Sequence, residues 1–337
     1  MTSASVREAR HLALEDKNIL YLNSFPNEKL VLAVSVSSRK QSSDVLSVSV
    51  WDQHLTKLIK RTYLEFETSE KESDIKVESD GKFVVFYNLS KGFINLYEFP
   101  KFNKPILSLN SLENLKAVVL YSQQHRLFTA VRDKEIDCYK YYGEEVEYTI
   151  NLQSKQNLET IYLIQEQKWL IATTVNEVYT IDVNQRSPLN NFETHKLPAI
   201  GKSDYDLEHV LGYISKPNKI ILKAKEVSAN SSGLQEKEDI IEICNMNDLR
   251  KDMRFSLGTD IGFYFINEQD SEVIWSIKNS LYLLDLKSKE VAHLYTLNRN
   301  QTFITGKVLG KSCGRGANTL VVATADRLKL LSYSVDE

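Results

Sequence analysis

The feature that most constrains this chain is a repeated pair of short apolar strands joined by a tight polar turn. A clear copy runs from Lys82–Tyr87 through Asn88–Gly92 to Phe93–Phe99, and the same plan returns at 126–141, 168–183, 272–286 and 319–333. Runs rich in Val, Ile, Leu and Tyr, bounded by Asn, Asp, Lys and Gly, are typical of β-hairpins. Two looser copies, at 29–52 and 219–245, bring the number of units to seven.

One position in the second strand of each pair can be aligned through all seven units. It is occupied by Trp51, Tyr97, Tyr139, Ile181, Cys244, Leu284 and Leu331. Successive copies lie 40 to 47 residues apart, except for one step of 63 that contains a polar insert at 226–238 in the fifth unit. A period of about 40–45 residues with four strands per unit is the spacing of β-propeller blades. The sequence therefore predicts an all-β chain that forms a single seven-bladed β-propeller domain over residues 1–337. The rival arrangement, a β-sandwich followed by a second β domain, explains the strands but not the even period.

Each unit also has room for one strand before its hairpin and one after it. Inner strands are expected at 116–120, 160–164, 210–214 and 303–308, and outer strands at 57–66, 105–109, 146–152 and 291–297. The last unit has no outer strand of its own, whereas Val6–Leu14 precedes the first unit without another role. We therefore expect Val6–Leu14 to pair with Leu328–Tyr333, complete the last blade and close the ring, because a closed ring leaves no exposed sheet edge there.

The second strand of each pair, which is the third strand of its unit, carries a family resemblance. SVSVWDQ (Ser47–Gln53) resembles the end of the third strand of a WD repeat, with Trp51 and Asp52 in place of the pair that names the repeat. Tyr97-Glu98 and the acidic Asp285 stand at equivalent positions in their units. No His follows a Gly anywhere in the chain, so the Gly-His dipeptide of regular members is missing. The chain is thus similar to divergent WD-repeat propellers, and this resemblance implies a platform for binding other proteins.

Composition and motifs narrow the function further. The net charge of -3 indicates no attraction of the whole surface to nucleic acid or anionic lipid. Three cysteines far apart in sequence are typical of reduced thiols in a cytoplasmic or nuclear protein. No stretch approaches 18 uninterrupted apolar residues, so no membrane insertion is expected. The CxxC, HxxxH, HExxH and P-loop patterns are absent, and we expect no metal and no cofactor.

The candidate partner-binding residues lie in two irregular segments. The link between the first two units, 65–80, is acidic, and Glu67, Glu70 and Glu72 are candidates for docking a basic partner, although a solvated charged loop is the simpler interpretation. The glycine-rich stretch 310–318 contains Lys311 and Arg315, which together with backbone N–H groups suit an anionic partner group. No helix follows this stretch, so a plain hairpin connection is the simpler interpretation there.

Two further segments have interpretations that depend on the strand assignment. Lys57, Lys60 and Arg61 form a basic group near Trp51, which is too small to indicate nucleic-acid binding and fits a solvated blade edge. The insert at 226–238, EVSANSSGLQEKE, has no apolar periodicity, and we expect it to be a mobile surface loop.

These observations favour a non-enzymatic scaffold that binds other protein subunits of an intracellular complex. The alternative is a non-catalytic, RNA-associated subunit of a tRNA-modification or ribosome-assembly complex, which would require Lys and Arg to gather on one face. An enzyme would need His, Asp or Glu side chains to converge from several inner strands, and the expected inner strands carry few of them.

Overall fold

The structure is a computed structural model that describes most of the 337 residues. The described residues are 4–13, 19–25, 28–37, 45–65, 74–164, 168–175, 177–184, 192–196, 205–216, 218–229, 235–248, 250–258, 261–267, 271–299, 301–311, 317–324 and 327–335. The chain divides into two compact units. The first contains Met1–Val77 and Asp260–Glu337, and the second contains Glu78–Thr259.

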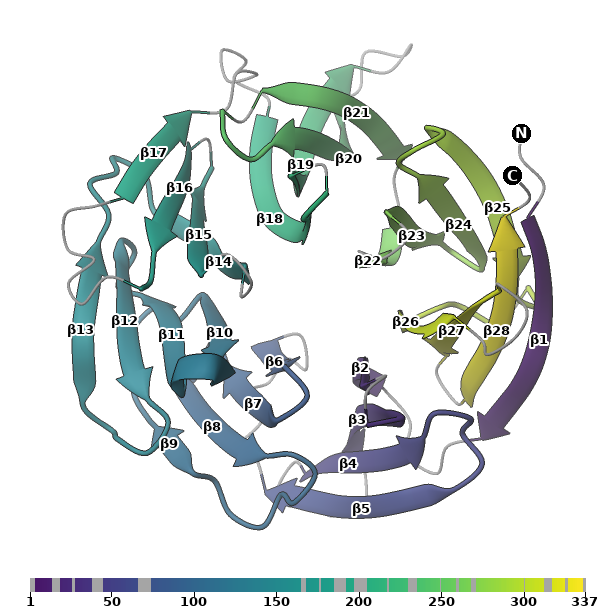
Figure 1. Ribbon diagram of the computed structural model, residues 1–337, viewed down its shortest axis with the longest axis horizontal. Coiled ribbons are helices and arrows are strands. Elements are labelled where there is room, and N and C mark those ends of the chain that lie inside the picture. Colours follow the sequence, from purple (N-terminus) through teal and green to yellow (C-terminus); the bar gives the residue numbers. More distant parts are fainter. Residues whose placement is uncertain are drawn as a thin grey trace. The chain divides into compact units, whose positions relative to one another are not determined.

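The first unit carries three four-stranded antiparallel sheets, which we call blades one, six and seven (Figure 1). Blade one consists of β2 (Ile19–Phe25), β3 (Leu30–Ser37), β4 (Val45–Asp52) and β5 (Leu58–Glu65). Blade six consists of β22 (Ile261–Asn267), β23 (Glu272–Ile277), β24 (Ser280–Asp285) and β25 (Glu290–Thr296). Blade seven consists of β26 (Thr305–Lys311), β27 (Asn318–Ala323), β28 (Arg327–Val335) and β1 (Ala4–Ala13).

The second unit carries blades two to five, apart from the first three residues of β6 (Ile75–Ser79), and the strands of these blades follow chain order. Blade two consists of β6 (Ile75–Ser79), β7 (Phe83–Asn88), β8 (Phe93–Glu98) and β9 (Leu107–Leu109). Blade three consists of β10 (Ala117–Tyr121), β11 (Arg126–Val131), β12 (Glu135–Lys140) and β13 (Val146–Asn151), with the short 3-10 helix η2 (Ser122–Gln124) after β10. Blade four consists of β14 (Leu158–Ile164), β15 (Trp169–Thr174), β16 (Glu177–Asp182) and β17 (Phe192–Lys196). Blade five consists of β18 (Tyr205–Ile214), β19 (Lys219–Ala229), β20 (Gln235–Asn245) and β21 (Lys251–Gly258).

The aligned position of the sequence repeat is a core position in every blade. Its side chain is at most 8% exposed in all seven copies. Neighbouring blades of one unit bury apolar side chains against each other, as Phe128 and Cys138 of blade three do against Ile161 and Leu170 of blade four. Each fully buried Leu, Ile or Phe contributes about 1.5–3 kcal/mol of transfer free energy. The even period of the sequence is therefore the period of this buried layer.

A second regularity concerns the backbone just before the second strand of a blade. The residue there has a positive φ in five blades: Lys29 (54°), His125 (52°), Lys168 (58°), Asn218 (62°) and Ser271 (60°). Its carbonyl accepts the N–H of the residue two places after the aligned position, for example from Tyr141 to His125 at 2.9 Å and from Met246 to Asn218 at 3.1 Å. This bond ties the turn before the second strand to the end of the third strand.

The acidic half of the WD-like pair forms the next turn. Asp52 accepts the backbone N–H of Lys57 at 2.8 Å and that of Thr56 at 2.5 Å. Asp182, Asn245 and Asp285 stand at the same place, and each accepts the N–H of the residue two places on, at 2.8–2.9 Å. Such Asx turns offer the backbone a partner as the strand ends, which explains why Asp or Asn recurs there.

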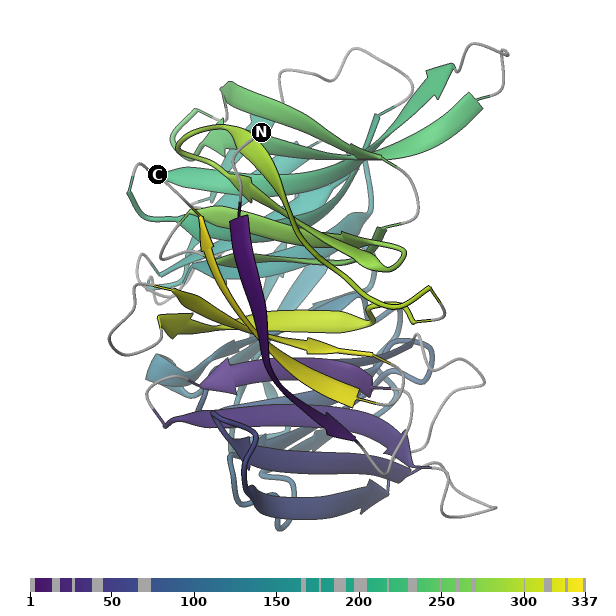
Figure 2. The same ribbon diagram turned by 90° about the vertical axis from the view of Figure 1, so that its right-hand side faces the viewer.

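The N-terminal strand completes blade seven, as expected. β1 pairs antiparallel with β28, with Val6 opposite Tyr333 and Leu12 opposite Leu328, and one bulge lies between Glu8 and Arg10. Figure 2 shows β1 lying alongside β28. The strand expected at Val6–Leu14 is thus confirmed. In the sheet order β1-β28-β27-β26, the fourth strand of the last blade comes from the N-terminal end of the chain.

Two expectations from the sequence are wrong. The insert at 226–238 was expected to be a loop, but Glu226–Ala229 and Gln235–Glu238 extend β19 and β20, and residues 230–234 lie outside the described part. The hairpin continues because each antiparallel pair places the next N–H and C=O groups in register, which requires no apolar periodicity. The acidic link 65–80 also contains a strand, because Ile75–Ser79 forms β6, the first strand of blade two.

Candidate functional site

The described surface has a hollow at one end of blade three, where η2 leads into β11 and where β12 turns into β13. It encloses about 490 Å³, within the usual range for ligand pockets. We call it the blade-three hollow, and its lining consists of Gln124, His125, Arg126, Lys140, Tyr141, Tyr142 and Gly143. All of these residues belong to the second unit.

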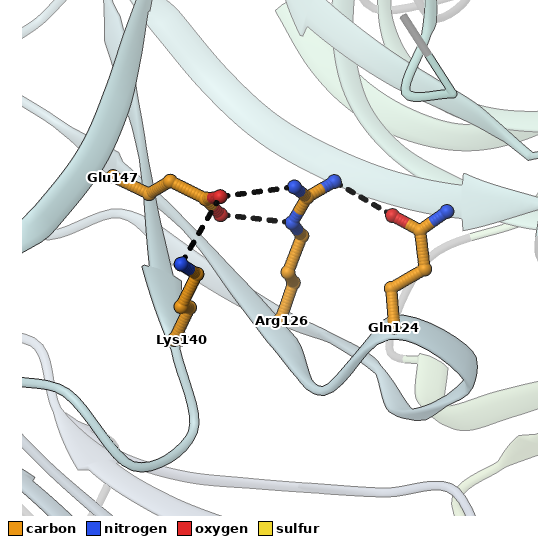
Figure 3. A network of polar contacts seen from close by, with 4 residues as sticks. All are labelled: Gln124, Arg126, Lys140 and Glu147. Carbon is orange, nitrogen blue, oxygen red and sulfur yellow. Dashed lines mark hydrogen bonds and ion pairs between the residues drawn. The ribbon is translucent and has the colours of Figure 1, made fainter. Parts of the chain in front are cut away.

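A polar network holds one wall of the blade-three hollow (Figure 3). The Arg126 guanidinium donates from Nε to Glu147 Oε2 at 2.9 Å and from Nη2 to Glu147 Oε1 at 3.1 Å. Its Nη1 donates to Gln124 Oε1 at 2.6 Å, and Lys140 Nζ lies 3.6 Å from Glu147 Oε1. Because Arg126 begins β11, Lys140 ends β12 and Glu147 lies in β13, the network joins three adjacent strands.

The contacts in this wall favour the ionised form of Glu147 and hold the Arg126 side chain in place. Burial opposes ionisation of Glu147, but hydrogen bonds from Arg126 and the charges of Arg126 and Lys140 hold the pKa of Glu147 below its ordinary value. The Arg126 guanidinium also lies 5.6 Å from the centre of the Tyr148 ring, a cation–π distance. A bidentate Arg–carboxylate pair with a third donor engaged has little conformational freedom. The wall is therefore ordered before anything binds to it.

Aromatic rings form the other wall. Tyr142 is 73% exposed, the largest value among the big apolar side chains of the described surface, and its ring centre lies 6.3 Å from that of His125. His125 in turn contacts the buried Tyr141 ring edge-on at 5.8 Å, and Tyr141 contacts Phe83 at 4.7 Å. The rings thus run from the core between blades two and three out to the surface, so Tyr142 is backed by packed aromatic side chains.

A second hollow of about 330 Å³ lies on the first strands of the second unit, β6, β10, β14 and β18. Asp80 lines it and accepts N–H groups of Lys82 and Phe83 at 3.1 and 3.0 Å and the hydroxyl of Ser122. Burial raises the pKa of the Asp80 carboxyl above its ordinary value. The Ser122 hydroxyl lies 3.4 Å from Tyr141 Oη, so a short polar chain connects this hollow with the core beneath the blade-three hollow.

The described residues near the two hollows include a hydroxyl group, Ser122, and an imidazole ring, His125. Among the described residues, the His125 ring contacts Phe83, Tyr141 and Tyr142, and no hydrogen bond joins it to the Ser122 hydroxyl. A serine nucleophile needs such a base within hydrogen-bond reach. No three His, Cys, Asp or Glu side chains of the described residues are placed to hold a metal ion. The described helices include none long and apolar enough to cross a membrane.

The cysteines within the described residues are core side chains. Burial is the main cause that raises the thiol pKa of Cys138 and of Cys244 to about 12. A thiol with so high a pKa has almost no thiolate at neutral pH and is unreactive. Cys313 lies outside the described residues.

Of the five sequence-predicted site residues, only Lys311 lies within the described residues. Glu67, Glu70, Glu72 and Arg315 lie outside the described residues. Lys311 ends β26, with its backbone opposite Asn318 of β27. The strands on either side of the glycine-rich stretch, β26 and β27, pair antiparallel. Residues 310–314 also match the spacing of a G-x-S-x-G nucleophile elbow, but that motif requires a strand followed by a helix, whereas β27 follows here.

The sequence did not reveal the blade-three hollow, because its parts are separated along the chain. Arg126 and Glu147 are 21 residues apart and meet only through the registers of β11, β12 and β13. One signal was present: the pair Tyr141-Tyr142 follows the third strand directly, so a large ring next to the buried one had to point away from the core.

Comparison with known proteins agrees with this architecture. No protein-family model matches the sequence, and no curated protein matches it. Among solved structures, the chain is similar to the crystal structure of the WD40 domain from Toxoplasma gondii coronin. The TM-score is 0.62 at 9% sequence identity, and the match covers 100% of this chain and 87% of the coronin chain. The fold is a seven-bladed β-propeller, as the sequence period predicted, and it has this WD40 domain as a structural neighbour.

Proposed function

We propose that this protein is a non-enzymatic scaffold that holds other protein subunits within an intracellular complex, in the cytoplasm or the nucleus. The observation that carries the proposal is the blade-three hollow, in which the exposed Tyr142 ring stands beside an ordered Arg126–Glu147 pair. WD40 propellers generally serve as protein-interaction scaffolds. Fold alone does not say which surface binds, so the site has to be argued from its side chains.

The residue types of the blade-three hollow fit a protein interface. Tyr and Arg are the residues most often found as energetic anchors of interfaces, where they occupy well-packed central positions. Tyr142 offers a large ring that rests on His125, and Lys140, with a side chain that is 66% exposed, offers a cation that can pair with an acidic group of a partner. Because Arg126 is held by Glu147 and Gln124, ordering it costs no further entropy on binding.

Purification of the tagged full chain from its native cells tests this proposal. We expect Tyr142→Ala combined with Lys140→Glu to lower recovery of the co-purifying proteins by roughly tenfold or more, as loss of an interface anchor does. Val291→Ala, at an exposed position of β25, is the matched control and should leave recovery unchanged. Val291→Ala should melt at the wild-type temperature because its side chain lies at the surface. The double variant should stay folded and melt only slightly lower, because the Lys140–Glu147 contact that it loses is partly exposed and such contacts contribute about 1 kcal/mol or less.

The same experiment separates the alternative functions. Equal recovery of partners with the double variant and the control would show that the blade-three hollow is not the interface. The RNA-associated alternative would be favoured if RNA co-purifies with the chain and if nuclease treatment removes all co-purifying proteins together with that RNA. Charge reversal at Glu67, Glu70 and Glu72, and at Lys311 and Arg315, tests the two segments that the sequence singled out.

A further inference from the structure

The outer strand of blade one, β5, exposes more large apolar side chains than the other outer strands whose side chains the structure describes. β5 is the last strand in the order β2-β3-β4-β5, so one side of its backbone faces away from the sheet. Three of the six large apolar side chains exposed on the described surface lie on it: Leu58 (36%), Ile59 (49%) and Tyr63 (41%). The outer strands β13 and β25 each expose one, Val146 and Val291.

Natural sheets usually protect such an edge with charges or a short strand. β9 is only three residues long, and β21 turns Asp252, Arg254 and Ser256 outward. β5 spans eight residues, with regular register against β4 from Lys60 to Glu65 and with Ile59 as an additional residue of a bulge. It is thus long and regular enough to accept another strand along its outer side.

The charges around β5 indicate the kind of strand it would accept. Lys57 is exposed, and Lys60 and Arg61 are half-buried beside Ile59 and Tyr63. The only carboxylate in the strand is Glu65, at its far end. An extended segment that alternates acidic and apolar side chains would match both the cations and the apolar surface.

We propose that the outer edge of β5 binds an extended acidic segment of a partner protein by adding it as a fifth strand to blade one. Backbone hydrogen bonds would supply affinity, and contacts with Ile59, Tyr63 and the neighbouring cations would supply specificity. The proposal rests on the scaffold function proposed above, but it concerns a surface of the first unit rather than the blade-three hollow.

The edge chemistry disfavours the other occupants. Pairing of β5 with β5 of a second copy would bring Lys57, Lys60 and Arg61 of the two chains together, and like charges across a strand pair are destabilising. A single-stranded RNA would gain from the cations but would leave Leu58 and Ile59 without apolar contact. These occupants become outcomes of the test.

The test measures peptide binding to the purified full chain by fluorescence anisotropy. The probe is a labelled nine-residue peptide in which Glu or Asp alternates with Val and Phe, and the comparison peptide carries Lys in place of every acidic residue. We expect saturable binding of the acidic peptide that weakens as salt is raised, because Lys57 is exposed to solvent and Lys60 and Arg61 are only half-buried. Ile59→Lys with Tyr63→Lys should weaken it by roughly tenfold or more, since the apolar contacts are lost.

Val291→Lys on β25 is the matched control and should leave the affinity unchanged. The proposal is overturned if the acidic peptide does not saturate, if the basic peptide binds equally well, or if the variants bind like the wild type. It is also overturned if a uridine oligonucleotide displaces the acidic peptide, or if binding needs the chain to dimerise. If the peptide test fails while recovery of partner proteins still depends on Tyr142, only the β5 proposal is wrong. If the peptide test and the Tyr142 test both fail, the scaffold function is wrong as well.

Discussion

Residues other than glycine occupy the left-handed backbone region before the second strand in five blades, and each of them holds a hydrogen bond there. The position is filled by Lys29, His125, Lys168, Asn218 and Ser271. A side chain with a Cβ costs about 1–2 kcal/mol in this conformation, with Asn the best tolerated after Gly. The bond from the end of the third strand offsets part of that cost in each blade. The sequence could not show this regularity, because the five residue types have little in common.

Asn218 is the position where this arrangement can be tested most clearly. Its Oδ1 accepts the hydroxyl of the buried Tyr213 at 2.6 Å, and its Nδ2 donates to Asn247 Oδ1 at 2.9 Å. We expect Asn218→Ala to lower the free energy of unfolding by about 2–3 kcal/mol, from backbone strain together with loss of the hydrogen bond that Tyr213 donates to Asn218. Asn218→Gly should cost less, because it removes the strain. Urea unfolding of the two variants checks the order, and a glycine variant as unstable as the alanine variant would contradict it.

Asp80 should make stability depend on pH in an unusual direction. Its folded pKa lies above the ordinary value of 3.8 because the carboxyl is buried, so the folded state binds the proton more tightly than the unfolded state. Its contribution is therefore complete below about pH 3.8 and is lost as the pH rises through the raised pKa. Asp80→Asn keeps an acceptor for the Lys82 and Phe83 N–H groups and removes the charge. We expect the variant to gain stability relative to the wild type as the pH rises from 4 to about 7.

Asp52→Asn is the matched control for Asp80. The Asp52 pKa is below its ordinary value, because hydrogen bonds from Thr56 and Lys57 outweigh the effect of burial. Its contribution is present above about pH 3.8 and is lost only as the pH falls through the lowered pKa. The difference between Asp52→Asn and the wild type should therefore stay constant from pH 4 to 7. Parallel curves for the two variants across that range would contradict the assignment of Asp80.

At the scale of the strands, the sequence predicted the repeat period and the hairpin of each blade, but it predicted the first strand of only some blades. Hairpins show as dense apolar runs around a polar turn, and all seven are present. β6 was missed because Ile75–Ser79 alternates two apolar residues with charged ones inside an acidic stretch. The extension of β19 and β20 was missed because backbone pairing holds it, and its sequence resembles a loop.

The N-terminal strand provides the element-scale prediction. β1 pairs with β28 from Ala4 to Ala13, and Leu12 packs against the cluster that blade seven shares with blade one. Deletion of residues 1–14 should leave β28 as an unpaired edge and lower the melting temperature by more than about 5 °C, as loss of a whole strand from a sheet implies. A synthetic peptide of residues 4–13 should restore part of the loss. A truncated chain that melts like the full chain would contradict the role of β1.

At the scale of the whole molecule, fold and site differ in how far the sequence predicts them. The fold follows from seven copies of one apolar pattern, because each blade needs the same buried layer. The blade-three hollow is particular to one blade and depends on strand register, on the Arg126–Glu147 pair and on the outward direction of Tyr142. A repeat can be recognised in a single sequence. A site that is present in just one blade can be recognised only after the strand registers are known.

Photo-crosslinking from Tyr142 tests the central claim most directly. In one variant of the full chain, produced in native cells, p-benzoylphenylalanine replaces Tyr142. In a second variant it replaces Val291, which lies on the outer strand β25 and is likewise exposed. If the blade-three hollow is a protein interface, irradiation should give a discrete adduct of the chain with another protein from position 142 and none from position 291. Adducts with RNA, identical adducts from both positions, or no adduct from position 142 while partners co-purify would contradict the account.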